Sequence, residues 1–274
     1  MSKRIFFDYT RGNIYHYGHF IVDAVIPFAN YIHTCNVSLD EICVQQEDRH
    51  QSMGGFMEHF EFIFAPITVR YLPKSEWDKR TDPVVFIKGF LAGPYPRVAL
   101  DWLAYRLYKE EEEDENDTPV VDILVIRRKY VPIKIYTDRN DMDPLTGSYR
   151  RSLINHEKVL EVVRDFGSKH NLTVGDIALE KMHVKEQIRL FARASIVIGQ
   201  HGAGMCNLAF THPLIGRKHR KLASVHVLEI SYWGMDTVKN LCAVQQAKHY
   251  FVDSTERNKC SLSSLQKCLH QTVL

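Results

Sequence analysis

A short glycine-rich segment carries the residue types best suited to bind an anion. It opens with the β-branched apolar run 195–198, typical of a buried strand, and closes with the apolar residues 205–210, which predict a helix. Between them, Gly199, Gly202 and Gly204 allow positive φ and let a ligand approach the backbone amides. Amides at a helix N-terminus favour a diphosphate. Because such a turn can also serve packing alone, both interpretations stay open at this point.

The glycine spacing differs from two common nucleotide-binding motifs. The pattern is G-x-x-G-x-G, whereas the dinucleotide fingerprint is G-x-G-x-x-G, and no P-loop lysine follows. A nicotinamide oxidoreductase is therefore disfavoured.

A histidine and a carboxylate near the N-terminus have the spacing of a catalytic base and its partner. His19 and Asp23 are four residues apart, so on a helix they share one face, where a carboxylate can orient an imidazole. The apolar residues that follow recur at helical spacing, with Pro27 as a predicted kink. The alternative is a polar pair without a catalytic role. In that case His16 and Asp8 are the next candidates for a base.

Charged residues at two further strands complete the candidate site. Glu229 interrupts the apolar strand 225–230, and burying a carboxylate is costly unless it has a partner. A ribose diol or a nearby Arg or Lys would supply the donors. Arg127 and Arg128 follow the apolar strand 120–126, at the strand end where open α/β sheets bind ligands.

Strand and helix patterns alternate along the chain, which predicts an α/β fold with parallel sheets. At residues 110–117, seven of eight residues are acidic, which is typical of a solvated linker rather than of a cation site. We therefore expect two domains, residues 1–116 and 117–274. The terminal helix is expected to carry both Cys260 and Cys268, and it is a candidate to pack back on the first domain.

The composition argues against several classes of protein. A net charge of +2 argues against non-specific binding of nucleic acid. No run approaches the ~20 apolar residues of a membrane span, and the N-terminus lacks the apolar core of a signal peptide. The six cysteines include no C-x-x-C pair, which indicates thiols in a reducing compartment. We expect a cytoplasmic protein without stable membrane insertion.

These features together resemble the core of the family 61 glycosyltransferases. The resemblance rests on the helix at 185–194, on the strand at 195–199, and on the residues that follow them, namely His201, Gly202, Ala203, Gly204, Asn207, Phe210 and Glu229. The upstream residues that match are Ile126, Arg127, Arg128, Arg150, Arg151, His19 and Asp23. Gln200 departs from the small or apolar residue that is common in the family, and the loop at 129–148 is longer than usual.

The resemblance implies two Rossmann-like domains facing a cleft, the GT-B arrangement, with the nucleotide sugar on the C-terminal domain and the acceptor mainly on the N-terminal one. It implies an inverting reaction without an obligatory metal or other cofactor. The residues implied to bind the donor are Arg127, Arg128, Arg151, His201, Gly202, Ala203, Gly204, Asn207 and Glu229, with Glu229 on the ribose. His19 or Asp23 would be the base, and which of the two stays open.

The most specific expectation is transfer of xylose from UDP-xylose to a glycan or glycoprotein acceptor. N-acetylglucosamine and other pentoses are the alternative donor sugars. The missing membrane anchor fits a cytosolic enzyme such as those that large DNA viruses carry, which would act in the host cytoplasm, or an enzyme of the Golgi lumen whose anchor was removed. A rival from another class is a non-catalytic module that binds a nucleotide sugar or a glycan, against which the presence of His19 and Asp23 argues.

Overall fold

The structure is a computed structural model, and it describes residues 4–8, 17–36, 38–45, 56–81, 84–86, 94–109, 121–128, 152–179, 182–231, 236–256 and 258–274. The chain divides into two compact units, Met1–Glu113 and Asp114–Leu274. The sequence places the boundary three residues later, after residue 116. The acidic run 110–117 and the polar segment 129–151 lie outside the described residues.

The first unit is built on a four-stranded sheet in the order β3-β2-β1-β4. Its strands are β1 (Arg4–Asp8), β2 (Glu41–Gln45), β3 (Thr68–Leu72) and β4 (Val84–Phe86). All three pairings are parallel, so helical crossovers must connect the strands. The chain moves outward from β1 to β3 and then returns to β4 on the other side of β1. This reversal is a topological switch point, next to which open α/β sheets bind their ligands.

The helices of the first unit bury an aromatic core. They are α1 (Tyr17–His19), the π-helix η1 (Phe20–Val25), α2 (Ile26–Cys35), α3 (Met57–Phe64), α4 (Lys74–Trp77) and α5 (Arg97–Lys109). The rings of Phe7 and Phe28 are 5.1 Å apart, and those of Phe28 and Phe64 are 4.9 Å apart. Phe60 and Phe64 are fully buried, so the aromatic stripe of α3 is core.

The second unit is built on a six-stranded sheet in the order β10-β9-β8-β7-β5-β6. Its strands are β5 (Ile123–Ile126), β6 (Val174–Ile177), β7 (Ile196–Gln200), β8 (His226–Ser231), β9 (Lys248–Glu256) and β10 (Lys259–Cys260). Strands β5 to β9 pair in parallel, and only β10 is antiparallel to its neighbour β9. A mixed α/β fold with two largely parallel sheets is therefore confirmed.

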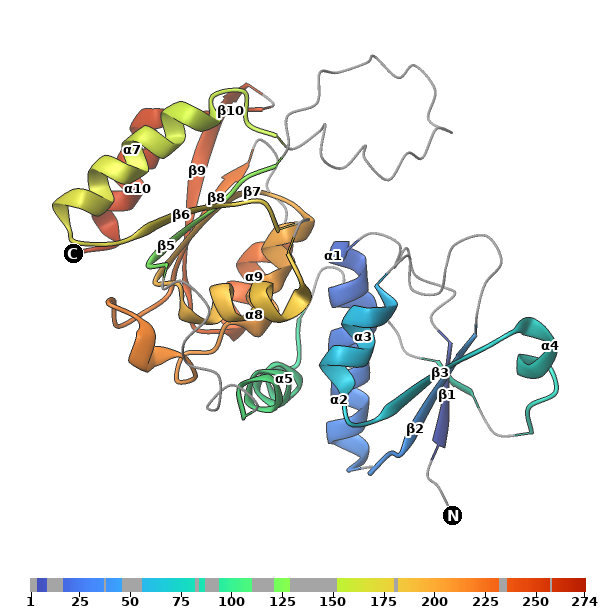
Figure 1. Ribbon diagram of the computed structural model, residues 1–274. Helices are drawn as coiled ribbons and strands as arrows, with labels where there is room; N and C mark the ends of the chain where they lie inside the picture. The colour runs from blue at the N-terminus through green and yellow to red at the C-terminus, as the bar shows by residue number, and fades with distance from the viewer. Residues whose placement is uncertain are drawn as a thin grey trace, which may run out of the picture. The chain divides into compact units, whose positions relative to one another are not determined.

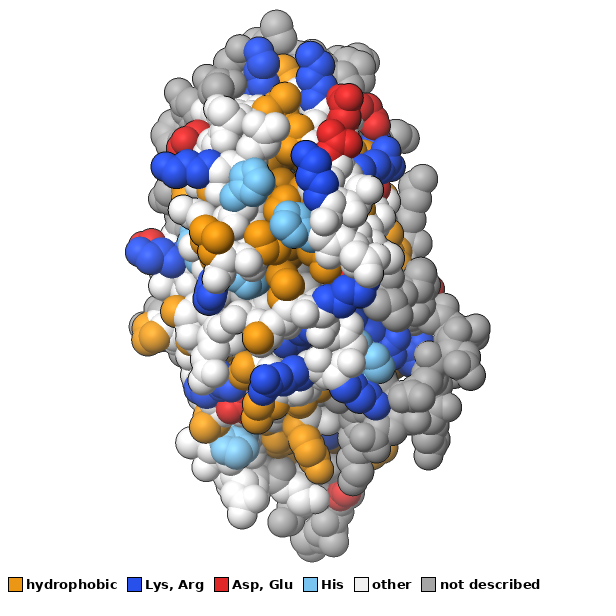
Figure 2. Space-filling model, turned by 90° about the vertical axis from the view of Figure 1, so that its left-hand side faces the viewer, with side chains coloured by type: hydrophobic (Ala, Val, Ile, Leu, Met, Phe, Trp, Pro, Cys, Tyr) orange, Lys and Arg blue, Asp and Glu red, His pale blue; other side chains and the backbone are white. Residues whose placement is uncertain are grey.

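Helices cover both faces of this second sheet (Figure 1). They are α7 (His156–Lys169), α8 (Val184–Arg193), the 3-10 helices η4 (Ala203–Phe210) and η5 (Arg217–His219), α9 (Asp236–Val244) and α10 (Leu262–Gln271). Helices α7 and α10 lie on one face, and α8 and α9 lie on the other. Figure 2 shows the side of the molecule with α7 and α10, where Lys, Arg and His side chains and some Asp and Glu side chains lie around a narrow apolar strip.

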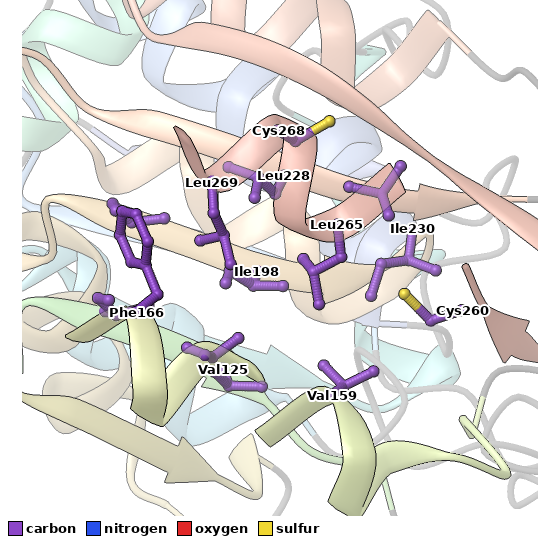
Figure 3. Close-up of a cluster of buried hydrophobic side chains, with 14 of the residues drawn as sticks. Val125, Val159, Phe166, Ile198, Leu228, Ile230, Cys260, Leu265, Cys268 and Leu269 are labelled. Carbon is purple, nitrogen blue, oxygen red and sulfur yellow. The ribbon is translucent and has the colours of Figure 1, made fainter. Parts of the chain in front are cut away.

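The core beneath α7 and α10 joins strand and helix side chains (Figure 3). Ile198 and Leu228 of the strands meet Phe166 of α7 and Leu265 and Leu269 of α10 in one buried cluster. The apolar face of the terminal helix thus packs within the second unit, and its packing on the first domain stays a prediction. None of the helices that the structure describes has the length and apolar character needed to cross a bilayer.

Two local predictions are corrected. Cys260 lies on β10 and not on the terminal helix, because Ser261 caps that helix by accepting a hydrogen bond from the Ser264 amide at 3.3 Å. The side chain of Asn155, at the N-cap of α7, binds both backbone groups of Cys260, at 2.9 and 3.0 Å. The helix predicted at 205–210 is the 3-10 helix η4, whose last six residues are all buried, so packing on every side sets its backbone.

Candidate functional site

The strand order of the second unit brings two of the predicted segments to one place. The chain runs from β5 to β6 on one side and then to β7 on the other side of β5, so the switch point lies between β5 and β7. Val125 of β5 pairs with Ile198 of β7 in parallel, and the carboxyl ends of both strands therefore meet at the same edge. Arg127 and Arg128 follow β5 at this edge, and residues 201–204, hereafter the glycine turn, follow β7.

Side chains at the glycine positions of the glycine turn would obstruct access to its backbone amides. Gly202 has φ 156° and ψ −173°, a region essentially restricted to glycine. A Cβ atom on Gly204 would lie 3.1 Å from Leu179 Cδ1 and 3.8 Å from a guanidinium nitrogen of Arg128. The first amides of η4 and the Arg128 guanidinium therefore border the same small space. Hydrogen-bond donors and a cation in this arrangement suit a phosphate group.

Arg127 is held by acidic side chains of the second unit. Arg127 forms ion pairs with Asp176 and, at 2.9 Å, with Glu157. His156 donates to the other oxygen of Asp176 at 2.9 Å. Burial alone would raise the pKa of Asp176, but the hydrogen bonds from Arg127 and His156 outweigh it and lower the pKa. The charge of Arg127 is therefore balanced by the protein, and Arg128 is the arginine next to the glycine turn.

Glu229 binds two histidines, which are partners that the sequence did not suggest. His201 Nδ1 donates to one carboxylate oxygen, and His249 Nε2 donates to the other at 2.7 Å. The side chain of Glu229 is 2% exposed. Burial would raise its pKa, but the hydrogen bonds from His201 and His249 prevail and lower it. Among the residues that the structure describes, the carboxylate is thus held by two histidines, and its contact with a ribose stays a prediction.

His249 was missed by the sequence analysis. Glu229 pairs with Phe251 of β9, and residues two apart on a strand share one face, so His249 lies on the same face as Glu229. The proximity of His249 to Glu229 follows only from the register between β8 and β9. A histidine in a strand next to two aromatic residues carries no local signal of this kind.

Asn207 supports the turn from within the protein. It is fully buried, and its amide donates to Gln187 Oε1 at 2.9 Å. Gln187 in turn donates to the carbonyl groups of Leu179 and Met182, at 3.0 and 3.1 Å. Asn207 thus connects η4 to α8, and its contact with the donor stays a prediction.

The structure brings His19 and Asp23 together in the first unit. His19 Nδ1 and Asp23 Oδ2 are 2.7 Å apart, and the side chains are 27% and 12% exposed. Asp23 lies in the π-helix, where the Ile26 amide donates to the Ile21 carbonyl five residues back. Pro27 explains the wide turn, because in a regular α-helix its ring would clash with the carbonyl group of Asp23, four residues earlier. Single π turns are frequent at functional sites.

Other predicted residues cannot be placed. Arg151 and His16 lie outside the described residues, as do the side chains of Ala203 and Asp8. Within the described part of the chain, no group of three or more His, Cys, Asp or Glu side chains is arranged to hold a metal ion.

The sequence of the chain matches a known family. The sequence model of the family described as Glycosyltransferase 61 matches residues 17–215. The match begins at the helix that carries the His19–Asp23 pair and extends past η4, so it includes both candidate groups and more than half of the chain. No curated protein matches the chain. The chain therefore belongs to the glycosyltransferase 61 family and is an enzyme that transfers a sugar from a donor to an acceptor.

Proposed function

We propose that this glycosyltransferase is an inverting, metal-independent xylosyltransferase that moves xylose from UDP-xylose to a hydroxyl group of a glycan. The two units would adopt the GT-B arrangement, with the nucleotide sugar on the second unit and the acceptor mainly on the first. The choice of xylose rests on family resemblance. The mechanism is supported by the His19–Asp23 pair and by the donors around the glycine turn.

His19 acts as the general base in this proposal, and Asp23 orients it. The observation that carries this assignment is the 2.7 Å contact between His19 Nδ1 and Asp23 Oδ2, by which the carboxylate orients the ring, and Nε2 would accept the proton of the acceptor hydroxyl. The greater exposure of His19, 27% against 12% for Asp23, supports the same order of roles. The deprotonated hydroxyl displaces the diphosphate from the opposite face of the anomeric carbon, which inverts its configuration.

The leaving diphosphate is stabilised by the second unit. The amides of the glycine turn and the guanidinium of Arg128 provide the hydrogen bonds and the positive charge. Arg127 positions this edge through Asp176 and Glu157. Glu229 acts on the donor through His201 in this proposal and not by a direct contact with the ribose.

A donor panel tests the proposal. The purified chain is incubated with UDP-xylose, UDP-arabinose and UDP-N-acetylglucosamine, with and without a glycan acceptor, and the anomeric configuration of the product is determined by NMR. We expect xylose transfer with inversion. Transfer of another sugar would contradict the donor assignment. Binding of UDP without turnover of any donor would favour the non-catalytic module.

A further inference from the structure

The hydrogen-bonded chain His201–Glu229–His249 links the glycine turn to the strand beyond it. His201 comes directly after β7, Glu229 lies within β8, and His249 lies within β9, so three neighbouring strands each contribute one member. The imidazoles are 14% and 18% exposed, and the carboxylate between them is 2% exposed. Each carboxylate oxygen accepts one imidazole N–H.

Both histidines are needed to satisfy this carboxylate. An ionised carboxylate this deeply buried is stable only when it is hydrogen-bonded and its charge is compensated. Removing the His249 donor would leave one oxygen unsatisfied, and the side chain could then turn toward another donor. The orientation of Glu229 toward His201 thus depends on His249.

The orientation of Glu229 also determines which nitrogen of His201 is available. Because Glu229 accepts from Nδ1, that nitrogen carries a proton and Nε2 is left for a ligand. His201 is the first residue of the glycine turn, and its Nε2 can donate to a phosphate oxygen when this nitrogen carries a proton.

We propose that His249 is a positioning residue for donor binding, which holds Glu229 so that Glu229 in turn fixes His201 for the diphosphate. This inference rests on the proposed donor site at the glycine turn. It adds to that site a residue outside the range that matches the family.

The test measures UDP affinity by calorimetry for the parent, His201→Ala, His249→Leu and the double variant. We expect His249→Leu to raise the Kd for UDP roughly 10-fold, the range for a lost hydrogen bond to a charged group. In the His201→Ala background the same change should have less than about a 2-fold further effect, because His249 acts through His201. An equal fold loss in both backgrounds, or an unchanged Kd in His249→Leu, would overturn the proposal.

Two conservative variants keep the test valid if His249→Leu does not fold. The Gln amide can place its N–H where His249 Nε2 lies, whereas the shorter Asn amide cannot reach Glu229. We expect His249→Gln to bind UDP within about 3-fold of the parent and His249→Asn to bind roughly 10-fold more weakly. Equal affinities of these two variants would contradict the inference. If His201→Ala itself leaves UDP affinity unchanged, the proposed donor site fails, and not only the role of His249.

Discussion

At the scale of single residues, the His19–Asp23 contact leads to the first prediction. His19→Ala and Asp23→Asn should each lower kcat by roughly 100-fold or more, because the acceptor hydroxyl loses its oriented base. The double variant should be about as slow as the slower single variant, as expected of residues that act as a unit. UDP affinity should stay near the parent value because the proposed donor site lies on the other unit. Initial rates and calorimetry measure the two effects.

A matched control for this pair is His33→Ala. His33 is an exposed histidine in α2, the helix that continues from the π-helix, and its loss should leave kcat unchanged. Parent-like rates in both His19→Ala and Asp23→Asn would show that the base lies elsewhere.

The second residue-scale prediction concerns His226 and pH. This histidine is 3% exposed and its ring stacks on Tyr250 with centroids 5.7 Å apart. Burial, with a smaller effect of Lys248, lowers its pKa from 6.5 to about 4. The unfolded chain therefore binds this proton at a higher pH than the folded chain does. The free energy of unfolding should fall by up to about 3 kcal/mol as the pH decreases from about 6.5 to 4.

Denaturant unfolding at pH 7 and pH 5 measures this effect. His226→Phe keeps an aromatic ring against Tyr250 but cannot titrate, so its stability should change less between the two pH values than that of the parent. An equal loss of stability in the parent and the variant would assign the pH dependence to other groups.

At the scale of elements, the glycine turn and the helix η4 behind it determine donor binding in the proposed mechanism. Gly204→Val should raise the Kd for UDP roughly 10-fold or more, because its side chain would occupy the space between the turn amides and Arg128. The melting temperature should change little, since the nearest atom, Leu179 Cδ1 at 3.1 Å, ends a flexible side chain. Calorimetry and thermal unfolding separate the two effects.

Gly199 provides the contrasting control. A Cβ atom there would meet Met205 Sδ at 2.7 Å and Ile126 Cδ1 at 3.1 Å, both within the core. Gly199→Ala should therefore lower the melting temperature. If Gly204→Val binds UDP as tightly as the parent, the glycine turn serves packing alone.

At the scale of the whole molecule, the last prediction concerns metal ions. In the proposed mechanism, backbone amides and Arg128 stabilise the charge of the diphosphate, so the transfer rate should not change when a chelator is added. The expectation comes from the sequence, where no Asp-x-Asp follows a predicted strand of the second domain. Asp141 and Asp143 have that spacing but belong to the polar segment outside the described residues. The measurement is the transfer rate with and without EDTA. Loss of activity that manganese restores would contradict the prediction, and Asp141→Asn would then test this segment as the metal site.

The sequence by itself determined the features that depend on local spacing. The β-branched apolar run predicted the strand that precedes the glycine turn. The His19–Asp23 contact also follows from spacing, because residues four apart on a helix must lie on one face. Even here, the π form of the helix was not predicted, since the effect of Pro27 on the turn before it depends on how the helix packs.

Only the tertiary structure decided the partners of the charged and polar side chains. Glu229 pairs with His201 and His249, and Arg127 with Asp176, across strands that are distant in sequence. The order of the strands also placed Arg128 and the glycine turn at one switch point. Strand order and register result from the packing of apolar faces over the whole sheet. The spacing of side chains along the chain does not determine them.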